Sequence, residues 1–223
     1  MIMIRIVSAG LLGIIFLLLM ASISSGENIL KKTADHKGST ERFWLDETAW
    51  QKLMEEPANH FLMARETLSR NDKKTAARNI SKGVNIINIE ILRAAKDMKP
   101  KLSNVVDELL LFVQDLNNNK EIIESDLERA FLRAESILVQ HKLAKADIYI
   151  AAGFLKNAAY ALEAACRHML YSQIWNPRKI SAEDAEVIKK TQEEMLFLID
   201  SENWSSQQII DVRNLLKHLL KKN

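Results

Sequence analysis

The chain has 223 residues, and its 31 Lys and Arg against 29 Asp and Glu give a formal net charge of +2, a balance that disfavours nucleic acid as a partner. Six glycines and three prolines are too few for the many turns of a β-sheet protein. Because 48% of the residues are hydrophobic, the chain can bury a core, which argues against disorder and predicts a globular all-α fold.

The N-terminal segment 1–24 has the three parts of a secretory signal peptide. Arg5 supplies a positive charge, an apolar run covers residues 6–21, and the small residues Ser22 and Ser24 precede a cleavage point before Ser25. The alternative is an uncleaved N-terminal anchor, because the apolar run approaches the roughly 18 residues that begin to span a bilayer. Both interpretations predict that the rest of the chain is exported, to the periplasm or the extracellular space.

Residues 25–40 show no apolar period and are predicted to form a flexible tether, followed by a single α-helical bundle domain over residues 41–223. A first helical stripe covers residues 43–54. Pro57 then begins a helix that reaches about Leu68, because proline is tolerated in a first helical turn.

The next two predicted helices lie on either side of Pro100. After a polar turn at residues 69–72, an apolar stripe predicts a helix over residues 76–95 that stops before this proline. Residues 102–116 carry apolar side chains over a broad face, so we expect this helix to be central in the bundle.

A capping box and a glycine define the following helix pair. Ser125 with Glu128 predicts the start of a long helix, because the two side chains can satisfy backbone N–H groups of the first turn. This helix is expected to reach about Ala152. Gly153 then offers a turn into a helix that ends near Trp175.

Two more helices are predicted at the C-terminal end. Ser181 with Asp184 begins one that runs to about residue 199, and Ser205 with Gln208 begins the last. The apolar face of the last helix is expected to dock on the bundle, with contact to a membrane surface as the alternative.

An internal similarity relates two segments that align without a gap. Asn71 aligns with Gly153, and the alanine pair at 76–77 aligns with the pair at 158–159. Small alanines allow two helices to approach closely, so each copy is predicted to be an antiparallel αα-hairpin. The fold is therefore expected to be a helical bundle of such hairpins, with two of them related. Chance agreement between alanine-rich helices is the alternative.

The segments 64–87 and 146–169 carry the small residues, short polar turn and paired alanines just described. They resemble tetratricopeptide-like hairpins, and also the helical hairpins of exported bacterial YfdX-type proteins, which are implicated in stress tolerance. The resemblance implies a helical fold and a stress-related role, and it implies no functional residue.

His60, His141 and His168 are the weak candidates for metal ligands. A di-iron site in a bundle needs Glu and His three residues apart on two helices, and this pattern is missing from the sequence. A structural role is therefore predicted for each histidine, and no metal is predicted. The residues that would bind a small cofactor are not identified.

Catalytic motifs are also missing from the sequence. It contains no haem-attachment motif, glycine-rich phosphate loop or nucleophile elbow, so we predict no cofactor and no enzyme. The only cysteine, Cys166, lies in an alanine-rich stretch and is predicted to be a small buried residue. An intermolecular disulfide or a thiolate ligand is the alternative.

Trp175 and Trp204 are the candidates for partner binding, because both lie near predicted helix ends where exposed aromatic side chains can anchor a partner. The leading functional hypothesis is an exported non-catalytic scaffold, adaptor or assembly and stress factor. Its expected partner is another envelope protein or a second copy of the chain, and a membrane is expected only if the leader is uncleaved. The alternative is a bundle that binds a small ligand or metal ion.

Overall fold

The computed structural model describes residues 56–176, 180–201 and 205–222. All of them belong to the unit formed by Asp46–Asn223. The predicted leader, tether and first helical stripe lie outside the described residues, as does Trp204.

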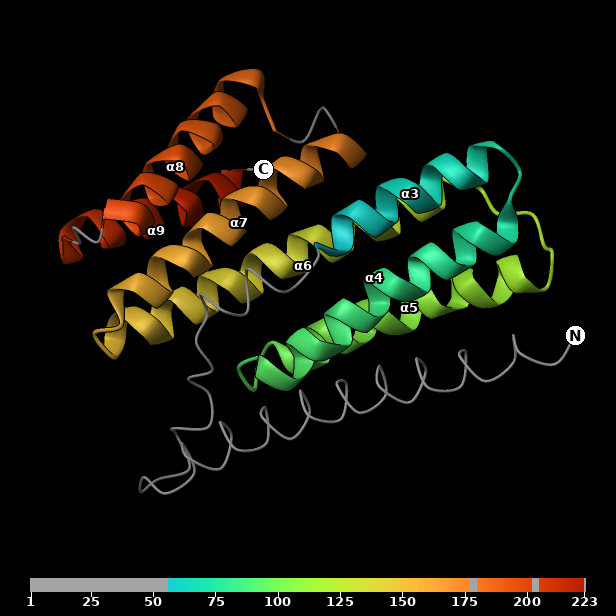
Figure 1. Cartoon of the computed structure of the whole chain (residues 1–223), viewed down its shortest axis with the longest axis horizontal. Helices are drawn as coiled ribbons and strands as arrows, with labels where there is room; N and C mark the ends of the chain where they lie inside the picture. The colour runs from blue at the N-terminus through green and yellow to red at the C-terminus, as the bar shows by residue number, and fades with distance from the viewer. Residues whose placement is uncertain (1–55, 177–179, 202–204, 223) are drawn as a thin grey trace, which may run out of the picture. The chain divides into compact units, whose positions relative to one another are not determined.

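All regular secondary structure in the described part of the chain is α-helical, which confirms the all-α prediction (Figure 1). None of the helices in this part has the length and apolar content of a bilayer-spanning segment. The helices, in chain order, are α3 (Pro57–Ser69), α4 (Lys73–Arg93), α5 (Lys99–Asn117), α6 (Glu124–Ala151), α7 (Leu155–Trp175), α8 (Ala182–Ser201) and α9 (Ser206–Lys222).

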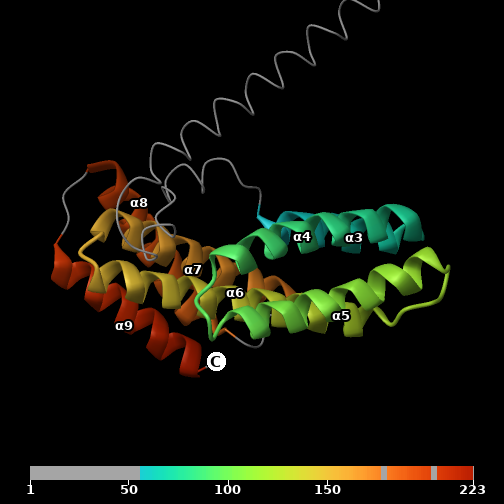
Figure 2. The same cartoon turned by 90° about the horizontal axis from the view of Figure 1, so that it is seen from below.

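Consecutive helices pack against each other. Figures 1 and 2 both show α3 beside α4 and α6 beside α7, and α8 packs mainly on α7. The α3–α4 and α6–α7 turns share a hydrogen-bond pattern. Asp72 N–H donates to the Thr67 carbonyl at 3.0 Å, and at the aligned positions Phe154 N–H donates to the Tyr149 carbonyl at 2.9 Å.

Several predicted helix starts agree with the structure. Pro57 lies in the first turn of α3. The Ser181 hydroxyl accepts a hydrogen bond from Asp184 N–H at 3.0 Å, and the Ser205 hydroxyl accepts one from Gln208 N–H at 3.4 Å. The docking of α9 is also confirmed, because it contacts α6, α7 and α8 through a face that includes Ile209, Val212, Leu216 and Leu219.

The capping box predicted at the start of α6 was wrong. The N-cap of α6 is Ile123 and no side chain caps this helix, so Ser125 and Glu128 do not form a capping box. Helix α4 ends at Arg93, so it stops before Pro100 as predicted, and Pro100 lies in the first turn of α5. Proline fits there because its missing N–H has no partner in a first turn.

The expectation that residues 102–116 form the central helix was also wrong. Leu110 and Leu111 of α5 are exposed. The most enclosed helix is α7, in which residues 158, 159 and 161–166 are all buried between α6, α8 and α9. Alanine explains this placement, because a helix with small side chains allows neighbours to approach from several directions.

The aromatic part of the core joins α3, α6 and α7. The rings of Phe61 and Phe131 are stacked with centroids 4.5 Å apart, and Trp175 lies 4.9 Å from Phe131. Gly83 of α4 faces this stack, and a Cβ atom there would lie 2.4 Å from the Phe61 ring. Glycine therefore allows α4 to approach α3 closely.

Candidate functional site

The three histidines predicted as candidates lie on α3, α6 and α7, and all three are buried. Among the described residues there is no group of three His, Cys, Asp or Glu side chains placed to hold a metal ion. The structure therefore does not bring His60, His141 and His168 together at one centre. His141 and His168 instead belong to two separate clusters of buried charged side chains.

The first cluster, which we call the Glu90 cluster, joins α4 to α6 and contains Glu90, Arg93, His141, Lys142 and Lys145. One Glu90 oxygen, Oε2, lies 2.9 Å from His141 Nε2, and the other, Oε1, accepts a hydrogen bond from Lys142 Nζ at 2.8 Å. Lys145 Nζ lies 4.0 Å from Oε2, and Arg93 Nη1 lies 3.9 Å from Oε1. One carboxylate therefore has four basic side chains around it.

The environment of the Glu90 cluster shifts two pKa values. Burial alone would raise the pKa of Glu90, but the charges of Lys142 and Lys145 and the hydrogen bond from His141 hold it well below its usual value. Burial lowers the pKa of His141, although the Glu90 carboxylate opposes this effect. Glu90 is thus held as a carboxylate beside an imidazole that resists protonation.

The second cluster, which we call the Glu135 cluster, joins α3, α6 and α7 and contains Glu56, Glu135, Glu163, Arg167 and His168. The imidazole of His168 lies between two carboxylates, with Nδ1 2.7 Å from Glu135 Oε2 and Nε2 3.5 Å from Glu56 Oε2. Arg167 Nη2 bridges Glu56 and Glu163 at 3.2 and 2.9 Å. Because the two carboxylates contact opposite ring nitrogens, they cannot share a metal ion through one His168 nitrogen.

Glu135 is the most enclosed carboxyl of this cluster. Burial raises its pKa, the nearby His168 lowers it, and Glu56 adds to the rise. Its Oε1 atom is buried and has no hydrogen-bond partner among the described residues. A buried acceptor without a partner is unusual in proteins.

Sequence reasoning missed both of these carboxylates. Glu90 lies on the buried stripe of α4, which also contains Val84 and Ile87 at helical spacing. An acidic residue at an apolar position of a helix is a signal for a buried ion pair, and Glu135 in the buried face of α6 carries the same signal. The basic partners of Glu90 on α6 come from another helix, and only the fold identifies them.

Trp175 is not exposed, so the reason for choosing it as a partner-binding residue was wrong. Only 6% of its surface is accessible, because it packs on Phe131 and under the guanidinium of Arg65, which lies 5.1 Å from the ring centroid. Trp204 lies outside the described residues. Cys166 is buried as predicted, and burial raises the pKa of its thiol, which makes it unreactive.

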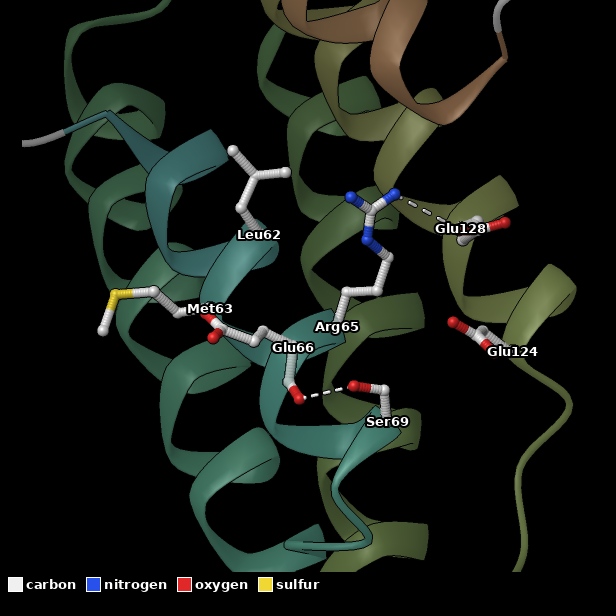
Figure 3. Close-up of a pocket in the computed structure, with 7 residues that line it drawn as sticks. All are labelled: Leu62, Met63, Arg65, Glu66, Ser69, Glu124 and Glu128. Carbon is white, nitrogen blue, oxygen red and sulfur yellow. Dashed lines mark hydrogen bonds and ion pairs between the residues drawn. The ribbon is translucent and has the colours of Figure 1, made fainter.

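A pocket of about 550 Å³ lies between α3 and the start of α6 (Figure 3). Arg65 and Glu128 face each other across it with Nη1 and Oε1 3.5 Å apart, and the Ser69 hydroxyl donates to the Glu66 carbonyl at 2.8 Å. The pocket is wide open, and the charged groups that line it are exposed or partly exposed. We therefore do not assign it a ligand.

Large apolar side chains are exposed on the outer helices. On α8 the neighbours Leu196 and Phe197 are 45% and 70% exposed. On α4, Leu92 is 73% exposed and Ile89 lies at the limit of exposure. Side chains of this size are favoured at protein interfaces, and adjacent exposed pairs mark surfaces that can bind a partner.

Comparison with known proteins gives no relative for this chain. No protein-family model matches it, and neither a curated protein nor a solved structure is significantly similar. The resemblance of the hairpin segments to YfdX-type proteins stays a prediction. Function must therefore be argued from the buried clusters and the exposed surfaces.

Proposed function

We propose that this chain is an exported, non-catalytic helical protein that acts as a scaffold, adaptor or assembly and stress factor through protein–protein contacts. The observation that carries the proposal is the exposed apolar pair Leu196 and Phe197 on α8. The proposal of export depends on the leader-like segment 1–24.

The position of this pair supports partner binding. The buried Ile188 and Met195 lie on the inner face of α8, which packs on α7. Phe197 lies on the opposite side of the helix, and Leu196 is partly exposed beside it. Burying the side chain of a phenylalanine contributes about 1.5–3 kcal/mol, which a partner gains by covering it. Aromatic side chains are enriched at protein interfaces, and the rim around them is polar.

The buried charged groups support a structural role rather than catalysis. Glu90 joins α4 to α6 through His141 and Lys142, and Glu163 on α7 accepts a hydrogen bond from the Gln192 amide on α8 at 2.8 Å. Each of these groups fixes the packing of helices. A rigid bundle with partly exposed apolar surfaces is suited to present contacts to other proteins.

Affinity purification tests the proposal. The protein, tagged after residue 223, is purified from its native envelope fraction and its companions are identified by mass spectrometry. A stoichiometric companion is expected with the wild type and should be lost with the double variant Leu196→Ser/Phe197→Ser. The matched control is Leu110→Ser/Leu111→Ser, which removes two exposed leucines from α5 and should keep the companion. A companion that survives the α8 variant, or neither a second protein nor a second copy of the chain in the purified material, would overturn the proposal.

A second candidate function is binding of a small ligand at the Glu135 cluster. The specific observation is Glu135 Oε1, which is buried beside His168 without a hydrogen-bond partner among the described residues. Native mass spectrometry of the purified protein tests it. A bound mass that is present in the wild type and lost in Glu135→Leu, while the helicity of the variant is unchanged, would support ligand binding at this cluster. Wild-type protein without a bound mass would exclude it.

A further inference from the structure

The outward face of α4 combines basic and apolar side chains. Lys74, Arg78 and Lys82 are exposed at intervals of four positions, and Ile89 and Leu92 follow them. At about 100° per residue these five positions fall within an arc of about 80°, so they form one face, which we call the α4 face. The only acidic residue of α4 is Glu90, which is buried, so the α4 face carries a charge of +3.

Acidic groups lie near the first turn of α4, where Glu121 forms an ion pair with Lys73. Asp72, the N-cap of α4, accepts a hydrogen bond from Thr75 N–H at 3.0 Å. Hydrogen bonding by Thr75 is the main reason that the pKa of Asp72 is lowered, with smaller contributions from the charges of Arg78 and Lys74. Asp72 is therefore ionised and offsets part of the charge of Arg78 and Lys74, but one carboxylate against three basic side chains leaves a net positive charge for an external anion.

The outward face of α8 has the opposite charge. Its exposed residues include five acidic side chains and two basic ones, Lys189 and Lys190, so its net charge is −3. It also carries the exposed apolar pair Leu196 and Phe197. The acidic residues of this surface, which we call the α8 face, are Glu183, Glu186, Glu193, Glu194 and Asp200.

The two faces of one molecule are not in contact with each other. Helix α4 packs on α3 and α5, helix α8 packs on α7 and α9, and both faces are exposed in the folded chain. We propose that the chain associates with itself head to tail, with the α4 face of one copy on the α8 face of the next. This inference rests on the proposed function and names the partner of the α8 face as a second copy of the chain.

Complementarity supports a second copy over other occupants. Each face has three net charges of opposite sign and two exposed apolar side chains, so pairing them satisfies both. An anionic lipid surface would suit the α4 face but would leave the acidic α8 face without a partner. Because two different surfaces meet, the contact is heterologous and generates a ring or an open filament.

Sedimentation velocity on the full-length protein tests this inference, at low and high salt and in a mild non-ionic detergent. One variant, Lys74→Gln/Arg78→Gln/Lys82→Gln, removes the charge of the α4 face. A second, Glu193→Gln/Glu194→Gln/Phe197→Ser, weakens the α8 face. The matched control, Arg129→Gln/Arg133→Gln/Lys221→Gln, removes three exposed positive charges from other helices. Circular dichroism checks that all variants fold.

We expect the wild type and the control to form salt-sensitive assemblies, and each face variant alone to associate at least about tenfold more weakly. An equimolar mixture of the two face variants should form a one-to-one dimer that does not grow, because each contributes the face that the other lacks. If the copies instead associate through residues 1–55, each variant measured by itself should assemble like the wild type, because these residues are unchanged in all of them.

Three results would overturn the inference: a monomeric wild type at low salt, face variants that assemble like the wild type, or a mixture that stays monomeric. Binding of a monomeric wild type to phosphatidylglycerol vesicles, lost in the α4 variant, would identify a membrane as the occupant instead. If the wild type is monomeric but the envelope companion is still lost with the α8 variant, the proposed function stands and only self-association is excluded.

Discussion

Asn71 and Gly153 occupy equivalent positions in two turns, one between α3 and α4 and the other between α6 and α7. Both have positive φ, 60° for Asn71 and 77° for Gly153. The N–H of Asn71 donates to the Leu68 carbonyl at 2.7 Å, and the N–H of Gly153 donates to the Ile150 carbonyl at 3.1 Å. Glycine and asparagine are the residues that adopt this left-handed conformation most readily, which is why they end helices.

The first prediction concerns this turn. Gly153→Ala should lower the free energy of unfolding by about 1 kcal/mol, because alanine is strained at positive φ. Gly153→Asn should cost less, since asparagine already adopts this conformation at position 71. An added Cβ would meet no atom within 4 Å, so steric contact does not contribute. Urea denaturation measures both variants, and equal losses for alanine and asparagine would contradict the argument.

The second prediction concerns the Glu90 cluster. Glu90→Gln should lower the free energy of unfolding by about 3–5 kcal/mol, because it removes the carboxylate that compensates the buried charges of Lys142 and Lys145. The double variant Glu90→Gln/Lys142→Gln should lose less than the single one. Glu186→Gln on the surface of α8 is the control, with an expected change below about 0.5 kcal/mol. If Glu90→Gln changes the free energy of unfolding as little as the control does, the Glu90 cluster contributes little to stability.

The third prediction concerns pH. The folded-state pKa of His141 lies below its ordinary value of 6.5, so the unfolded chain binds a proton there more readily. Stability from this group is therefore present above pH 6.5 and is lost as the pH falls below it. The free energy of unfolding of the wild type should fall more steeply between about pH 7 and about pH 5 than that of His141→Gln, in urea titrations at each pH. Parallel slopes would exclude this contribution.

The fourth prediction concerns the leader. If the segment 1–24 is a signal peptide, the mature protein begins at Ser25, which N-terminal sequencing of the protein from the envelope fraction will show. Replacing Leu17 and Leu18 with Arg should keep the protein in the cytoplasm, because charges interrupt the apolar run. An intact N-terminus on exported protein would instead favour the anchor, and export of the Arg variant would exclude both interpretations.

The helices were predictable because their signals are local. Pro57, Ser181 and Ser205 each mark a helix start through the chemistry of one turn, and the alanines of α7 identified a helix with close neighbours. The failures occurred where a local motif competes with packing. Ser125 has the spacing of a cap, but the N-cap of α6 is Ile123 and the helix begins at Glu124. The apolar face of α5 leaves Leu110 and Leu111 exposed.

The candidate sites were less predictable, because their partners are distant in the sequence. Glu90 and His141 are 51 residues apart, and Glu135 and His168 are 33 apart. Periodicity places His141 and His168 on helices without showing which carboxylate each one faces. The exposure of Leu196 and Phe197 likewise depends on how α8 is oriented on α7, which spacing alone does not determine.

The packing of consecutive helices has a consequence for how the chain reaches its native state. The most extensive contacts join neighbours in sequence, α3 with α4, α4 with α5, α6 with α7 and α7 with α8. Domains dominated by such local contacts fold quickly, because little loop-closure entropy is lost before each contact forms. If the protein is exported as proposed and emerges N-terminus first, it can therefore fold helix pair by helix pair, which shortens the time that its apolar faces are open to aggregation.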